Sequence, residues 1–207
     1  MADQLETSTT SPESMPRMIA FMSSILERVS NSNDLNRRLE PTQKLSVFHS
    51  LTTPTISIHS YLQRIFKYAD CSPSCFVVAY VYLDRFTQMQ PLLPIDSFSV
   101  HRLLITSVLV SAKFMDDNYY NNAYYARVGG ISTQEMNLLE VDFLFGLGFQ
   151  MNVTPVTYYT YCTYLQREML LQYPLQFEDS PVDLARRLKL HCSFDEDEST
   201  HQKQLSV

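Results

Sequence analysis

Glycine is scarce in this sequence. The 207 residues include four glycines, Gly129, Gly130, Gly146 and Gly148, all within one short span. β-Sandwiches and barrels need turn residues along their whole length, and phosphate-binding loops such as GxGxxG need closely spaced glycines near a helix start. Four glycines in one short span are too few for a β-sandwich or barrel, and they do not form a phosphate-binding loop. Because long apolar segments of helical periodicity accompany this scarcity, the sequence predicts an all-α fold.

The sequence also lacks the common patterns of catalytic and metal sites. It contains neither HExxH nor GxSxG, and its four cysteines form no CxxC pair. Cys71 and Cys75 have helical i, i+4 spacing, but no second pair follows at a zinc-like distance, so we interpret them as free thiols. Asp116 and Asp117 are adjacent at a helix end, where carboxylates more often cap the helix or face water. We therefore expect no catalytic residue, no cofactor and no metal.

The net charge of −6 comes entirely from the two ends of the chain. Residues 1–14 carry three acids and no base, and residues 176–207 carry seven acids and four bases. We expect disordered tails at 1–14 and 176–207 and one domain over 15–175. The neutral domain lacks the basic surface of nucleic-acid binding proteins. No apolar signal segment or membrane span is visible, so we expect the protein in the nucleus, the cytoplasm or both.

Residues 98–115 form the stretch around which the rest is organised. From Val100 to Ala112, apolar residues occur on every side of a 3.6-residue helix. Such a helix is buried by other elements or spans a membrane, and the polar residues His101, Arg102 and Ser111 exclude a membrane span. The pattern predicts a central helix surrounded by others, with His101 a structural histidine.

Further helices are predicted on both sides of this one, over about 15–29, 57–69, 73–86, 122–128, 133–147 and 155–171, with irregular chain over 30–56. The segment after Ser72 is rich in β-branched residues, but Pro73 at a helix start and the length of the run favour a helix. Gly129 and Gly130 provide a helix stop. For Asp84 two interpretations remain open: a surface charge, or a buried partner of Arg64.

Eight short stretches, in order and with consistent spacing, carry a resemblance to a known family. They are SYLQRIFKY (60–68), YLDRF (82–86), HRLL (101–104), AKF (112–114), DD (116–117), NAYYA (122–126), VGG (128–130) and EMNLLE (135–140). Residues 15–173 resemble a cyclin box, in particular that of the Pho80-like cyclins and the plant P-type cyclins, also called U-type. The motif residues of this resemblance include Arg64, Asp84, His101, Arg102, Gly129 and Gly130.

The resemblance implies a single five-helix cyclin box with an additional helix at each end. It implies a non-catalytic subunit that binds and activates a cyclin-dependent serine/threonine kinase as a heterodimer, here an A-type plant kinase, in cell division or the phosphate response. By motif position, Lys113 on the third box helix and Glu140 on the fifth contact the kinase. The alternative is a transcription-factor domain related to TFIIB that binds DNA; such proteins carry two repeats and a basic face.

Overall fold

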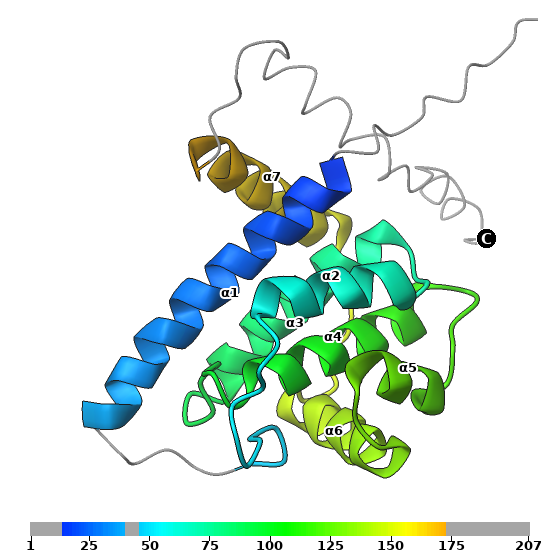
Figure 1. The fold of residues 1–207 in the computed structure, drawn as a ribbon. Helices are drawn as coiled ribbons and strands as arrows, with labels where there is room; N and C mark the ends of the chain where they lie inside the picture. Colours follow the sequence, from blue (N-terminus) through cyan, green and yellow to red (C-terminus); the bar gives the residue numbers. More distant parts are fainter. Residues whose placement is uncertain (1–13, 40–45, 173–207) are drawn as a thin grey trace, which may run out of the picture.

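The structure, a computed structural model, describes residues 14–39 and 46–172, and side chains within 15–37 and 46–169. These residues form helices and connecting loops, with no strand among them. The helices are α1 Ser14–Leu39, α2 Ile58–Tyr68, α3 Pro73–Met89, α4 Val100–Met115, α5 Asn122–Gly129, α6 Thr133–Gly146 and α7 Pro155–Gln172 (Figure 1). The predicted all-α fold is confirmed.

Helix α4 is the centre of the molecule. Every residue from Val100 to Ala112 is buried except Arg102. Helices α2, α3, α5 and α6 all contact α4, and Figure 1 shows it enclosed among them. The small polar residues inside it satisfy their hydroxyls within the helix, since Ser107 donates to the Leu104 carbonyl and Ser111 to that of Val108, both at 2.9 Å. The predicted central helix is therefore confirmed.

Helix α3 confirms the choice of helix over strand for the run that follows Ser72. Its apolar residues are buried on most sides, because α3 packs against α4, α6 and α7. The β-branched composition reflects this burial and not a strand. Tertiary packing of this kind overrides the modest helix preference of valine.

Helix α1 is longer than the sequence predicts. It continues to Leu39 through residues predicted to be irregular. Polar contacts with the loop before α4 hold its last turns: Asn33 Nδ2 donates to the Ile95 carbonyl at 2.8 Å, and Arg37 Nη1 lies 3.0 Å from Asp96 Oδ2. The prediction failed here because these partners are about sixty residues away, so no local apolar periodicity marks the extension.

Helices α1 and α7 contact each other outside the group formed by α2 to α6, as Figure 1 shows. Within the described ranges, no helix has the length and apolarity that a membrane crossing requires. The predicted tails and the domain limit at residue 175 lie outside the described residues and stay predictions.

Candidate functional site

Lys113 and Glu140, the two predicted kinase-contacting residues, form an ion pair with each other. Lys113 lies in the last turn of α4 and Glu140 in α6, and Lys113 Nζ is 2.6 Å from Glu140 Oε1. Asn122, the first residue of α5, donates through Nδ2 to Glu140 Oε2 at 2.7 Å. The three helices thus meet at one polar cluster, although the residues are up to 27 positions apart in sequence.

The packing of α4 and α6 brings this pair to the surface. Met136, Leu139 and Phe143 bury one side of α6 in the core, and Glu140 lies at the edge of that side. Lys113 also complements the negative end of the α4 dipole. The two side chains remain 28% and 15% exposed. The ammonium has three donors and the carboxylate has several lone pairs. The Lys113 side chain can therefore donate a further hydrogen bond to a bound protein, and the Glu140 side chain can accept one.

An exposed apolar residue follows each member of the pair in the sequence. Phe114 follows Lys113 and Val141 follows Glu140, and both are exposed. Leu138, Val141 and Phe145 share one solvent-facing side of α6 by their i, i+3 and i+7 spacing; we call them the α6 apolar face. Contiguous exposed apolar residues mark protein-binding surfaces.

No sequence motif marks the α6 apolar face. The available signal was that α6 has apolar residues on all sides, whereas contact with one core requires only one side. The central helix α4 has the same pattern because it is buried all round. Sequence alone does not distinguish these two cases.

The chain matches the model of a known protein family. The family model described as cyclin matches residues 3–151. The chain belongs to the cyclin family. Members of this family are regulatory subunits, and the match agrees with the resemblance of the helical motifs.

Individual plant cyclins are similar to this chain over most of their length. Cyclin-U4-1 of Arabidopsis thaliana is 65% identical over 194 residues, which cover 93% of this chain and 94% of that protein. Cyclin-P4-1 of Oryza sativa subsp. japonica is 55% identical over 185 residues, covering 87% and 84%. Cyclin-U4-3 of Arabidopsis thaliana is 52% identical over 221 residues, covering both chains fully. The predicted resemblance to P-type, or U-type, cyclins is confirmed.

Arg64 and Asp84 of this cyclin do not form the buried pair that was one of the two open interpretations. Arg64 Nη2 donates to the Arg127 carbonyl at 3.0 Å, near the end of α5. Asp84 Oδ2 accepts from Gln88 Nε2 at 2.9 Å and from the Tyr161 hydroxyl. The pairing interpretation is wrong because the packing directs Arg64 toward α5 and Asp84 toward α7.

His101 and Arg102 of the cyclin are structural residues. His101 Nε2 donates to the Ile56 carbonyl at 2.9 Å, and burial lowers the pKa of this imidazole. Arg102 Nε donates to Glu135 Oε1 at 2.6 Å and so joins the starts of α4 and α6. Ser132 is the N-cap of α6, since its hydroxyl accepts from the Glu135 backbone N–H at 3.1 Å, while the Glu135 carboxylate pairs with Arg102.

Gly129 and Gly130 end α5 as predicted. Gly130 has φ of +75°, in the left-handed region that glycine adopts without strain. Gly129 allows close packing, since an added Cβ would lie 3.0 Å from Ile105 Cγ1. The Tyr61 hydroxyl donates to the Gly129 carbonyl at 3.1 Å and joins this turn to α2.

Asp116 serves the start of α3. Its Oδ2 accepts from the backbone N–H of Ser72 at 2.9 Å and from Cys75 Sγ at 3.4 Å, while Asp117 is exposed. In the described part of the chain, no group of three or more His, Cys, Asp or Glu side chains is placed to hold a metal ion. Cys71, Cys75 and Cys162 are free cysteines; Cys192 lies outside the described residues.

Proposed function

We propose that this cyclin binds and activates a cyclin-dependent serine/threonine kinase, an A-type plant kinase, as a heterodimer. The observation that carries the proposal is the partly exposed Lys113–Glu140 ion pair at the junction of three helices, with the exposed residues Phe114 and Val141 next to its members in the sequence. We propose a role in cell division or the phosphate response, in the nucleus, the cytoplasm or both. The family match favours this function over DNA binding.

In the proposed complex the cyclin acts by shifting the conformation of the kinase. The apolar side chains supply affinity by being desolvated, and the ion pair supplies orientation. A kinase is active when the glutamate of its mobile C-helix pairs with the lysine that positions ATP. A surface that binds only this arrangement raises its population, and the cyclin contributes no reacting group.

Because the ion pair is partly exposed, its contribution to folding stability should be smaller than its contribution to kinase binding. Ion pairs at the surface contribute about 1 kcal/mol or less to folding stability, and this pair, at 28% and 15% exposure, keeps contact with solvent. The same charges, once covered by a partner, cost about 2–5 kcal/mol when one side is removed, which corresponds to roughly 30-fold to several-thousand-fold weaker binding. We therefore expect Lys113→Ala and Glu140→Ala to abolish kinase activation and leave the fold almost unchanged.

The decisive variant exchanges the two charges. Lys113→Glu combined with Glu140→Lys retains an ion pair between α4 and α6 but presents reversed charges to the kinase. Binding to an A-type kinase is measured by titration calorimetry and activity by phosphate transfer to a peptide, with Asp117→Ala, an exposed acid on the α4–α5 loop, as the control. If the pair is only structural, the exchange restores activity that the single alanine variants lack.

We expect the exchanged variant to fold as the parent does and to remain inactive, and the control to behave as the parent. The proposal is wrong if the alanine variants bind and activate the kinase within about threefold of the parent, a change of only ~0.7 kcal/mol.

A further inference from the structure

Glu140 is held by more contacts than its ion pair with Lys113 requires. Lys113 Nζ lies 2.6 Å from Glu140 Oε1, and Asn122 Nδ2 donates to Glu140 Oε2 at 2.7 Å. Each carboxylate oxygen therefore has a donor of its own, and rotation of the Glu140 side chain would break at least one of the two contacts. The carboxylate is thus held in one orientation although 15% of the side chain stays exposed.

The amide of Asn122 directs both of its hydrogens to α6. Besides the hydrogen bond to Glu140, Nδ2 donates to Asn137 Oδ1 at 2.8 Å, one turn earlier on α6. The opposite orientation of the amide would turn its oxygen toward two acceptors, so this network determines which of the two atoms is the nitrogen. Asn122 is the first residue of α5, but its side-chain hydrogens serve the neighbouring helix.

This orientation leaves one polar atom of Asn122 unsatisfied. Among the described residues, Asn122 Oδ1 is buried and has no hydrogen-bond partner, which costs folding free energy. The start of α5 is capped without Asn122, because Asn121 is the N-cap and its Oδ1 accepts from the Tyr124 backbone N–H at 3.1 Å. A side chain that costs folding free energy and does not cap its own helix indicates a functional constraint.

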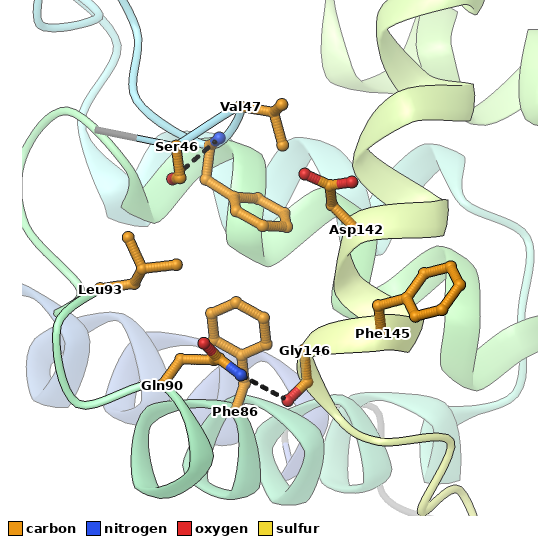
Figure 2. A pocket seen from close by; sticks show the side chains of 9 residues that line it. Ser46, Val47, Phe86, Gln90, Leu93, Asp142, Phe145 and Gly146 are labelled. Atoms are coloured by element: carbon orange, nitrogen blue, oxygen red, sulfur yellow. Dashed lines mark hydrogen bonds between the residues drawn. The ribbon is translucent and has the colours of Figure 1, made fainter. Parts of the chain in front are cut away.

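A second carboxylate on α6, that of Asp142, provides the contrast. Asp142 follows Glu140 by two residues and therefore lies about 200° around the helix from it. It is exposed and lines a cavity of about 700 Å³ between the ends of α3 and α6 and the segment 46–48. Figure 2 shows its carboxylate with no hydrogen bond to the other residues drawn, and within the described ranges this side chain has neither a hydrogen bond nor an ion pair. The fixed orientation of Glu140 is thus due to its neighbours and not to its place on α6.

We propose that Asn122 is a positioning residue, which fixes the Glu140 carboxylate in the orientation that the kinase binds. This role rests on the proposed function, which assigns Glu140 to the kinase contact. Asn122 acts through Glu140 and needs no contact with the kinase. A side chain already confined to one rotamer loses less conformational freedom when a partner covers it, so the complex is tighter.

The test measures the Glu140 side chain in the free protein and kinase binding in separate experiments. The full chain is isotope-labelled at Glu and Asp, and carbon–carbon couplings in the NMR spectrum show whether a side chain has one rotamer or averages among several. In the parent we expect one rotamer for Glu140 and averaging for Asp142, which is the internal reference. In Asn122→Ala we expect averaging for both, and a kinase affinity about three- to tenfold lower by titration calorimetry.

Two further variants distinguish positioning from a structural role. Asn121→Ala removes the N-cap of α5 and should lower the free energy of unfolding, but the rotamer of Glu140 and the kinase affinity should stay as in the parent. Asn122→Asp keeps the size of the side chain and suits the start of a helix, where acids are favourable, yet it turns a second carboxylate toward Glu140. It should weaken kinase binding at least as much as Asn122→Ala.

The positioning role is refuted if Glu140 averages in the parent or keeps one rotamer in Asn122→Ala, or if Asn121→Ala weakens kinase binding as much as Asn122→Ala does. It is also refuted if Asn122→Ala binds the kinase as tightly as the parent while Glu140→Ala does not. If Glu140→Ala itself binds the kinase as the parent does, the proposed function is wrong. Averaging of Glu140 in Asn122→Ala would still show, in that case, that Asn122 holds this carboxylate.

Discussion

Gly146 is the residue at which the packing leaves least room. A Cβ added there would lie 2.3 Å from Phe86 Cε2 and 2.9 Å from Cδ2. The ring has little freedom to move away, since it stacks on Phe143. We expect Gly146→Ala to lower the free energy of unfolding by about 1–3 kcal/mol through overpacking, measured by urea unfolding followed by circular dichroism.

Gly130→Ala is the matched control for this prediction. Its φ of +75° is strained for alanine, but the nearest atoms to an added Cβ are those of the Arg64 guanidinium at 3.7 Å. Strain without a clash should cost about 1 kcal/mol. A Gly146→Ala variant as stable as the parent would show that α6 and α3 separate easily at this contact.

His101 should make stability depend on pH. Burial lowers its pKa below the ordinary value, because Nδ1 is buried without a hydrogen-bond partner in the described structure and the imidazolium would leave a buried N–H unsatisfied. The unfolded chain then binds a proton more readily than the folded chain, so the free energy of unfolding falls as pH drops below about 6.5.

The measurement is urea unfolding of the parent and His101→Gln at about pH 7.5 and pH 5.5. We expect the variant to lose less stability between the two pH values than the parent. It should retain some dependence, because burial also lowers the pKa of His49. Identical losses in the two proteins would contradict the assignment to His101.

At the scale of elements, the last turns of α1 depend on Arg37. Its guanidinium contacts Asp96, whose side chain is 0% exposed, and lies over the Phe98 ring at 4.5 Å. Arg37→Ala leaves the buried carboxylate with the backbone N–H groups of Phe98 and Ser99 and with His49 at 3.6 Å. We expect a loss of about 1–3 kcal/mol in the free energy of unfolding, with reduced helicity.

Arg64→Ala is the control for this element. Among the residues that the structure describes, Arg64 donates its side-chain hydrogen bond to the carbonyl of Arg127 at a more exposed position, and its removal should cost less than about 1 kcal/mol. Both variants are compared by urea unfolding. Equal losses would mean that the contact with Asp96 does not stabilise the end of α1.

At the scale of the whole molecule, the acidic C-terminal segment is predicted to be dispensable. Residues 176–207 combine a net negative charge with clustered acidic residues, a composition that predicts little contribution to a packed core. A chain that ends at Pro174 should bind the kinase as the parent does and retain its helicity per folded residue. Calorimetry with the kinase and circular dichroism test this; loss of the complex would show that the segment docks.

Patterns within short segments of the sequence were sufficient to predict most of the helices. Burial on all sides of α4, the Ser72–Pro73 start of α3 and the Gly130 stop of α5 are properties of short segments, and each was predictable. The family motif also singled out Lys113 and Glu140, whose role in kinase binding stays a prediction; their contact with each other came only from the structure.

Packing between distant segments decided the rest. The extension of α1 beyond residue 29 depends on Asp96, and the partners of Arg64 and Asp84 depend on where α5 and α7 lie. The α6 apolar face and the cavity beside Asp142 exist because one side of α6 meets the core and the other does not. Periodicity records which residues are apolar, but only the assembled helices determine which of them stay exposed, because burial is a property of neighbours and not of a single segment.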